Sequence, residues 1–352
     1  MDRILQEDFE TIANSNIEFE QFKNKTFMIT GATGLVGSLL VRALMYCDHK
    51  YSLNLQIIAV IRNQDKANSI YGEDINNPRL FFTKCDLSRE VLETDFKVNY
   101  LVHTAGITNS KMMVTNPVET ITTAIIGTKT VLDFAVSNGV ESVVYLSSME
   151  VYGDAGTTKR VTENELGYID INQVRSCYSE SKRMCECMCT AYSAQYGLNV
   201  KCARLAQTFG AGISKYENRV FAQFARSVIK GENIVLHTRG LSEGNYVYTS
   251  DAIKAILLLL GKGAHGQTYN VSNEENHTTI YEMAEMVASE IANSKIKVVY
   301  DIPEDRLLYG YAPDVKVFLS SEKMRELGWK PEVGLLESYK RLVAWIYENE
   351  FD

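Results

Sequence analysis

The sequence predicts an α/β fold of the Rossmann type, in which a smaller C-terminal α/β lobe follows a doubly wound parallel sheet. The first observation is a glycine-rich turn at residues 31–37, which separates an apolar run from an apolar-periodic segment. The second is the alternation of short apolar runs with segments of helical length up to residue 205, which indicates βαβ units and a parallel sheet. After residue 210 the rhythm changes, and this indicates a second, smaller unit.

The turn at residues 31–37 has the spacing G-x-x-G-x-x-G, a variant of the dinucleotide-binding fingerprint. Gly31 can adopt backbone angles closed to other residues, Gly34 lets a phosphate approach the main chain, and Gly37 lets the helix pack close to the strand. The helix N-terminus would present free N–H groups to a pyrophosphate. A glycine-rich loop without a ligand is the alternative, which the flanking strand and helix disfavour. The cofactor contacts expected in this turn are Gly31, Thr33, Gly34, Leu35, Val36 and Gly37.

The other elements follow in chain order. A polar and helical leader at residues 1–24 precedes the first strand. Further strands of the cofactor-binding domain are expected at 55–61, 80–83, 100–103, 142–147 and 199–205, with helices at 119–138 and 178–196. In the second unit we expect helices at 220–230, 251–260 and 279–294 and strands at 234–237, 267–271 and 295–300. The predicted division is a leader at 1–24, a cofactor-binding domain at 25–208 to which 242–270 return, and a substrate-binding lobe at 209–241 and 271–352.

Composition excludes several classes of protein. The chain has 352 residues with a net charge of -8, which argues against nucleic acid as the main partner. The N-terminus lacks an apolar signal core, and no apolar run reaches the roughly 20 residues that span a bilayer, so we expect no membrane association and a cytoplasmic location. The run at 255–260 is interpreted as a buried helix segment.

Seven cysteines without an export signal indicate reduced thiols. Cys185, Cys187 and Cys189 resemble a metal cluster, but only Cys185 and Cys189 would share a helix face. No second pair of Cys or His completes a tetrahedral site, so we expect no metal.

Three residues carry the predicted chemistry. Tyr178 and Lys182 lie one helical turn apart in YSESK, and Ser148 ends the fifth strand. Hydride transfer at a sugar carbon needs a base for the hydroxyl proton. A tyrosine can serve if the lysine ammonium draws the phenol pKa from about 10 toward neutrality. The serine hydroxyl would then bridge to the reacting oxygen.

Taken together, the motifs resemble the extended short-chain dehydrogenase/reductase family, the nucleotide-sugar epimerases and dehydratases. The resemblance spans residues 25–345 and is carried by GATGLVG, Asp86-Leu87, VHTAG, the NP…GT segment at 116–128, SSMEVYGD, YSESK and LGWKP. It implies that Ser148, Tyr178 and Lys182 are catalytic and that C4 of a nucleoside-diphosphate sugar is transiently oxidised. It also implies a homodimer built through helices of the large domain. The further cofactor contacts it implies are Asp86, Leu87, Thr104, Ala105, Gly106, Tyr178 and Lys182.

Within the family, RSCYSESKRMCECMCTAY looks most like the UDP-glucuronate decarboxylases and their dehydratase relatives. Glu150 supports this likeness and is expected to act near C5 of the sugar as a fourth catalytic residue, with a solvated turn glutamate as the alternative. The chain also departs from these relatives. Met149 replaces the dehydratase aspartate, and Gly244 and Gly310-Tyr311-Ala312 stand where arginines clamp the diphosphate. The expected substrate contacts are Thr108, Ser148, Met149, Glu150, Gln207, Arg219 and His237.

The cofactor is expected to be NAD or NADP. The second strand ends in Arg62-Asn63 with no acidic residue to bind a ribose hydroxyl. An arginine suits the 2′-phosphate of NADP, so NADP is modestly favoured. The alternative is an exposed arginine with NAD still bound.

Several functions remain open from sequence. The leading hypothesis is a nucleotide-sugar epimerase or 4,6-dehydratase, and the alternatives are a UDP-glucuronate-type decarboxylase and a 4-dehydrogenase or reductase. A catalytically silent protein that senses the cofactor or binds a partner is the hypothesis from another class. The intact Ser148, Tyr178 and Lys182 argue against it, because a sensor has no use for a phenolate base.

Overall fold

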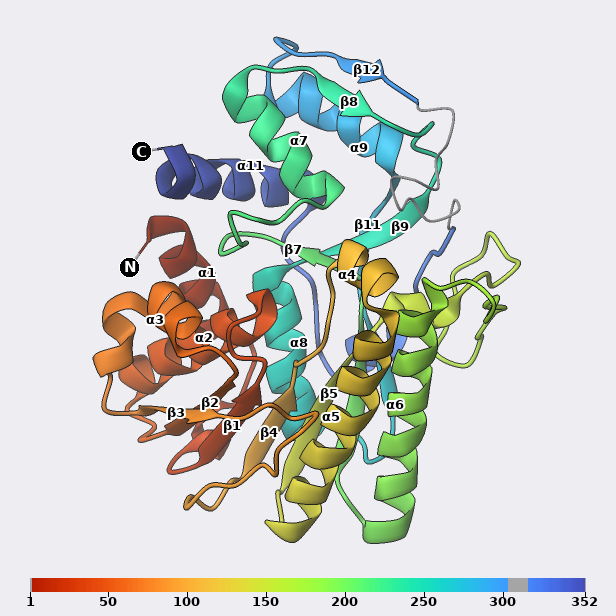
Figure 1. Ribbon diagram of the computed structural model, residues 1–352. Coiled ribbons are helices and arrows are strands. Elements are labelled where there is room, and N and C mark those ends of the chain that lie inside the picture. The colour runs from red at the N-terminus through yellow and green to blue at the C-terminus, as the bar shows by residue number, and fades with distance from the viewer. Residues whose placement is uncertain (1, 303–315, 352) are drawn as a thin grey trace.

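An apolar strand, β1 (Thr26–Thr30), lies inside the main sheet of the protein and is buried at every position. The computed structural model describes residues 2–302 and 316–351. In this part of the chain seven parallel strands pair in the order β10-β6-β5-β4-β1-β2-β3, which confirms the predicted Rossmann-type fold (Figure 1). The other six strands are β2 (Gln56–Ile61), β3 (Leu80–Lys84), β4 (Tyr100–His103), β5 (Ser142–Ser148), β6 (Val200–Leu205) and β10 (Thr268–Val271).

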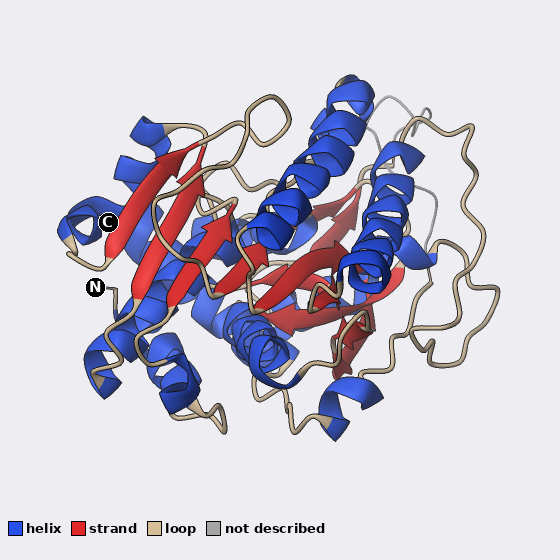
Figure 2. Cartoon of the chain, turned by 90° about the horizontal axis from the view of Figure 1, so that it is seen from below, coloured by secondary structure: helices blue, strands red, loops and turns tan. Residues whose placement is uncertain are grey.

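Helices cover both faces of this sheet (Figure 2). Alternate side chains of a strand point to opposite faces. Phe27 and Ile29 therefore join the core formed with α1, α2 and α8, whereas Met28 joins the core formed with α5 and α6. The helices of this unit are α1 (Arg3–Ala13), α2 (Leu35–Tyr51), α3 (Gln64–Tyr71), α4 (Ser110–Thr115), α5 (Pro117–Ser137), α6 (Ser176–Tyr196) and α8 (Thr249–Lys262). Residues 255–260 lie in α8 and are fully covered, as predicted.

A smaller lobe lies above the carboxyl ends of these strands (Figure 1). Its three-stranded sheet has the order β11-β9-β7, and a two-stranded sheet joins β12 to β8. Phe209 stacks on Phe221 and tilts against Tyr339, with ring centroids 4.9 and 5.3 Å apart, and this aromatic group forms the core of the lobe. The strands are β7 (Gln207–Phe209), β8 (Ile234–Leu236), β9 (Glu243–Tyr248), β11 (Asn273–Thr279) and β12 (Val298–Tyr300), and the helices are α7 (Val220–Lys230), α9 (Ile280–Met286) and α11 (Leu335–Ile346). The short helix α10 (Glu322–Glu326) packs instead on β10 of the main sheet.

The expected strands and helices are all present and differ from the observed ones at their ends. The α-helices and strands of the structure that were not expected are α3, α4, α10, α11, β7, β9 and β11. The helix expected at 279–294 is α9 followed by a π-helical turn, η4 (Val287–Ile291). The strands β7 and β11 are not foreseen, because β7 has three residues and β11 reads NEENHTT without apolar alternation. The predicted domain boundaries stay a prediction, although β10 does pair with β6 and α8 packs on β5.

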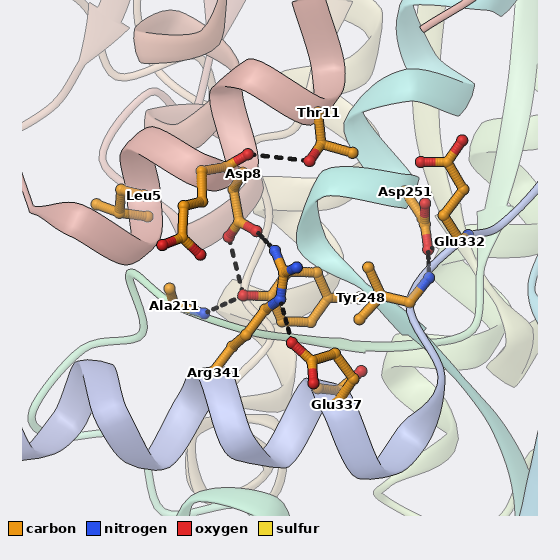
Figure 3. A network of polar contacts seen from close by, with 12 residues as sticks. Leu5, Asp8, Thr11, Ala211, Tyr248, Asp251, Glu332, Glu337 and Arg341 are labelled. Carbon is orange, nitrogen blue, oxygen red and sulfur yellow. Dashed lines mark hydrogen bonds and ion pairs between the residues drawn. The ribbon is translucent and has the colours of Figure 1, made fainter. Parts of the chain in front are cut away.

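The first helix is fastened to the smaller lobe by a buried polar contact (Figure 3). Arg341 Nη1 of α11 donates to Asp8 Oδ1 of α1 at 2.6 Å, and the Tyr248 hydroxyl donates to Asp8 Oδ2 at 2.8 Å. The same hydroxyl accepts from the Ala211 N–H. Burial raises the pKa of Asp8 to about 6, against the lowering effects of Tyr248 and Arg341. We name Asp8, Tyr248 and Arg341 the lobe contact.

None of the helices in residues 2–302 and 316–351 is long and apolar enough to cross a membrane. Gly310, Tyr311 and Ala312, where the sequence analysis notes a missing arginine, lie outside the described residues.

Candidate active site

A cleft of about 380 Å³ opens at the carboxyl ends of β1, β4 and β5, between the sheet and the smaller lobe. With the exception of His237, every residue that the sequence analysis expects at the cofactor or the substrate lines this cleft. His237 follows β8, and its Nδ1 lies 2.8 Å from the carbonyl oxygen of Asp301. The structure thus brings the candidate residues together, and their individual roles stay predictions.

The glycine turn forms one end of the cleft, which we name the cofactor end. Gly31 has φ +66°, and a Cβ there would lie 2.7 Å from Ala105 N. A Cβ at Gly37 would collide with the carbonyl oxygen of Gly31, so α2 approaches β1 as closely as its backbone allows. At Gly34 the nearest atom to a Cβ is 3.3 Å away, and this residue is the N-cap of α2. The open backbone at a helix N-terminus therefore fits the pyrophosphate of a dinucleotide.

Two cations line the cofactor end beyond the turn. Arg62 follows β2, and Lys66 lies four residues later in α3, so both face the same cavity. Burial, and then the charge of Arg62, lowers the pKa of Lys66. Lys66 lines the cleft but was not expected there from the sequence. Its spacing from Arg62 gave no signal, because Arg62 precedes the N-cap of α3 and the two residues do not share a helix face. Ser88 and Thr123 also line the cavity and are likewise missed.

Tyr178, Lys182 and Ser148 meet in the middle of the cleft. Tyr178 is 8% exposed, and its side chain is hydrogen-bonded to that of Ser148. Lys182 Nζ lies 5.9 Å from the centroid of the Tyr178 ring and donates to the Leu146 carbonyl oxygen at 2.6 Å. Ser148 Oγ also accepts from the Glu150 N–H, which caps the short helical turn η3 (Met149–Tyr152).

The pKa of Tyr178 corrects one expectation from the sequence. Instead of being drawn toward neutrality by Lys182, it is raised to about 12, first by burial and then by the charge of Glu150. Burial also lowers the pKa of Lys182. In the protein alone, desolvation therefore outweighs the charge of the lysine. A positive charge brought by a ligand would be needed to favour the phenolate.

His103 of β4 is buried close enough to Lys182 for the charge of the lysine to act on it. Its Nδ1 lies 2.7 Å from Thr30 Oγ1 and its Nε2 lies 3.2 Å from Thr128 Oγ1, so both ring nitrogens have partners. Burial, followed by the charge of Lys182, lowers the pKa of His103 to about 3. The imidazole is therefore neutral at physiological pH, and it bridges β1, β4 and α5.

The opposite end of the cleft, which we name the sugar end, is built from paired charges. Arg175 Nη2 donates to Glu150 Oε1 at 2.9 Å, and Ser179 Oγ donates to Glu150 Oε2 at 3.4 Å. Arg219 is bound by Glu217, with Nη2 2.7 Å from Glu217 Oε2 and Nε 3.0 Å from Glu217 Oε1. Glu150 is thus held by an ion pair, and this differs from the alternative of a solvated turn glutamate.

No three or more His, Cys, Asp or Glu side chains in the described residues gather to hold a metal. Cys185 and Cys189 are buried, and Cys187 is exposed.

The sequence profile of the NAD dependent epimerase/dehydratase family matches residues 27–272, about two thirds of the chain. The protein belongs to this family. The match contains the glycine turn, Ser148, Tyr178 and Lys182, so the residues that meet in the cleft are also the ones that the family profile spans.

Relatives in this family carry out several reactions. UDP-glucuronic acid decarboxylase 6 of Arabidopsis thaliana is 28% identical over 323 residues, which cover 92% of this chain and 88% of the relative. The dTDP-D-glucose 4,6-dehydratase of Homo sapiens is 24% identical, with coverage of 92% and 91%. A crystal structure of a dTDP-glucose 4,6-dehydratase from Streptomyces venezuelae with NAD bound has a TM-score of 0.73 at 25% identity and covers 92% of this chain and 97% of its own.

The sugar end departs from the patterns of such family members. Met149 is 7% exposed, and its Cε would lie 3.4 Å from a Cβ at Gly244. A methionine methyl group therefore reaches toward the place where decarboxylases carry an arginine by sequence resemblance. Gln207 lies in β7, beside Tyr246 of β9, and faces the cleft.

Proposed function

We propose that the protein is an NAD(P)-dependent nucleotide-sugar epimerase/dehydratase that works through transient oxidation of C4 of the sugar. The observation that carries the proposal is the meeting of Ser148, Tyr178 and Lys182 beside a backbone cradle for a dinucleotide. Membership of the family supports it.

Oxidation of an alcohol to a ketone removes a hydride from carbon and a proton from oxygen. A bound oxidised nicotinamide supplies the hydride acceptor and a positive charge in the cleft. Tyr178 takes the hydroxyl proton, and Ser148 orients the phenol and the reacting oxygen. Lys182, whose Nζ donates to the Leu146 carbonyl oxygen, would stabilise the phenolate by its charge once it forms. Return of the hydride to the opposite face of the C4 ketone would give the 4-epimer. The ketone would also acidify the C5 proton, which allows elimination, and would stabilise the carbanion that loss of carbon dioxide leaves at C5.

The sugar end bears on the choice among these reactions. An elimination needs an acid to expel water, and the apolar Met149 cannot supply it. The paired Glu150 and Arg175 remain available beside the sugar. We therefore rank 4-epimerase above 4,6-dehydratase, and we keep a UDP-glucuronate-type decarboxylase and a 4-dehydrogenase or reductase as alternatives.

The test is incubation of the holoenzyme with a panel of UDP-, GDP-, CDP- and dTDP-sugars that includes UDP-glucuronate. An epimer at C4 supports the main proposal, carbon dioxide release supports the decarboxylase, and a 4-keto-6-deoxy product supports the dehydratase. If no nucleotide sugar changes the redox state of the bound cofactor, the enzyme proposal is wrong and the catalytically silent alternative gains support.

We further propose a preference for NADP. Arg62 and Lys66 both face the cofactor end and would contact a 2′-phosphate. Because both are exposed, we expect the preference to be two- to tenfold. Fluorescence titration with NADP and with NAD measures the two affinities. Arg62→Ala should weaken the binding of NADP and leave the binding of NAD unchanged. Tighter binding of NAD by the unaltered protein would contradict this preference.

We also propose a homodimer built through α5 and α6, which pack side by side. Apolar side chains on these helices remain exposed in the single chain: Val118, Ile121, Ile126, Met184 and Tyr196. Sedimentation should find a dimer that Ile121→Glu weakens, and a wild-type monomer would contradict the proposal. The cytoplasmic location stays a prediction from composition.

A further inference from the structure

Arg175 lies at the sugar end three residues before Tyr178, and neither the glycine turn nor the YSESK motif assigns it a role. Its Nη2 donates to Glu150 Oε1 at 2.9 Å, and its guanidinium carbon lies over the Tyr178 ring, 5.5 Å from the centroid. The side chain is 25% exposed, and it lies behind Glu150 and Tyr178, which line the cleft. One guanidinium therefore contacts a carboxylate and a phenol at once.

The charge of Glu150 disfavours the deprotonation of Tyr178 that the proposed reaction requires. An ionised carboxylate close to a phenol disfavours loss of the phenol proton. After burial, the charge of Glu150 is the main influence that raises the pKa of Tyr178, and the charge of Arg175 lowers it. Arg219 acts in the same direction as Arg175, but its guanidinium is already bound by Glu217.

We propose that Arg175 is a positioning residue for the proposed reaction, which holds the Glu150 carboxylate at the sugar and cancels its charge at Tyr178. The inference rests on the proposed function and adds to it a reason why a carboxylate and a phenolate base can work in one cleft. Arg175 does not touch the reacting atoms in this scheme. It acts through the two residues that do.

The other charged and titratable groups around Tyr178 come from several elements. Lys182 lies on the same helix with its Nζ bound to Leu146, so its position is fixed independently of Arg175. Ser179 is a second partner of Glu150 and is uncharged. The groups that face Tyr178 are Tyr145 of β5, Glu150 of η3, Cys177 and Lys182 of α6, and Arg219 before α7.

The first test needs no sugar substrate. Tyrosine isotope-labelled at Cζ is incorporated, and the Tyr178 signal of the NAD-bound protein is assigned with Tyr178→Phe and titrated by NMR. We expect Arg175→Met to raise the pH midpoint of the Tyr178 titration by about one unit and Glu150→Gln to lower it by about as much. The midpoint of the double variant should lie close to that of the wild type. Lys111→Met removes an exposed cation on α4 and should change nothing. The inference is overturned if the midpoint in Arg175→Met equals that of the wild type, or if the midpoint in the double variant is as high as in Arg175→Met.

The second test uses the most active nucleotide sugar of the panel. In Arg175→Met the acid limb of the kcat profile should move to higher pH, with roughly a tenfold loss at neutral pH and little change in KM. Arg175→Lys keeps the charge and should recover part of the loss, which also shows that the fold is intact. A change confined to KM would mean that Arg175 binds the sugar, and would overturn the inference. Absence of any turnover by the wild type counts against the proposed function, while the NMR titration still decides on Arg175.

Discussion

The two ends of the cleft are built by different means. At the cofactor end the cleft is shaped mainly by backbone atoms. Gly31 and Gly37 have no room for a side chain, and Gly34 leaves the N-terminus of α2 without one. At the sugar end charged side chains hold each other, across separate segments in the pair of Glu150 with Arg175 and within one loop in the pair of Arg219 with Glu217. The cofactor end tolerates few residue types, whereas the sugar end can change its chemistry by exchanging partners. A family with one cofactor and several reactions fits this division.

The largest expected effect separates chemistry from cofactor binding. Tyr178→Phe removes the hydroxyl that takes the substrate proton, and we expect a rate loss of about 10²- to 10⁴-fold. Because the glycine turn is untouched, the affinity for the cofactor should stay within about twofold. The measurement is the single-turnover rate of cofactor reduction beside a binding titration. Unchanged activity would remove Tyr178 from the mechanism.

The buried His103 should make the stability of the protein sensitive to acid. Its folded pKa of about 3 lies below the unfolded value, so the unfolded state binds the proton first as pH falls below about 6.5. The free energy of unfolding should therefore decrease on acidification by about 1.4 kcal/mol per pH unit, roughly 3 kcal/mol from pH ~6.5 to ~4.5. Urea unfolding of the wild type and of His103→Gln measures the difference. Parallel pH profiles of the two proteins would show that His103 does not titrate as described.

The lobe contact should respond to pH in the opposite direction. The folded pKa of Asp8, about 6, lies above the unfolded value of 3.8, so the folded state binds the proton first. The contribution of Asp8 to stability is then greatest at acid pH and decreases as pH rises toward 6, by roughly 2 kcal/mol between pH ~4.5 and ~6.5. Asp8→Asn should gain stability relative to the wild type over this interval. A relative loss would mean that the pair with Arg341 outweighs burial.

A further prediction tests the backbone cradle, with an effect similar in size to that at Asp8. Gly37→Ala places a methyl group against the carbonyl oxygen of Gly31, and we expect a loss of about 1–3 kcal/mol in stability and weaker cofactor binding. Gly334→Ala is the control, because Gly334 lies at the start of α11 and nothing lies within 4 Å of a Cβ there. Equal behaviour of the two variants would contradict the close approach of α2 to β1.

The sequence was sufficient for the fold and the cofactor end because both depend on local patterns. Apolar runs of strand length and a glycine at each third position already define strand, turn and helix. The sugar end was less accessible, since the ion pair that holds Glu150 joins residues far apart in the chain. Glu150 and Arg175 are 25 positions apart. The same is true outside the cleft in the lobe contact, where Asp8 and Arg341 are 333 positions apart. No periodicity in the sequence reports such a pair.

The pKa of Tyr178 was missed for a related reason. The spacing of Tyr178 and Lys182 indicated a stabilising charge, but the extent of burial depends on the packing of β5, η3 and the smaller lobe around the phenol. Lys66 was missed because the apolar residues of α3, such as the buried Ala67 and Tyr71, indicate only its packed face. They do not distinguish a cation that would face the cofactor from one that faces water.

The return of β10 to the edge of the main sheet has a consequence during synthesis. β10 pairs with β6, yet more than sixty residues of the smaller lobe and α8 lie between them in the chain. Until residue 271 has left the ribosome, β6 presents a row of unpaired N–H and C=O groups to any neighbouring extended chain. A nascent or truncated product that stops near residue 210 would therefore be prone to join other chains edge to edge, and overproduction of such fragments should give insoluble material.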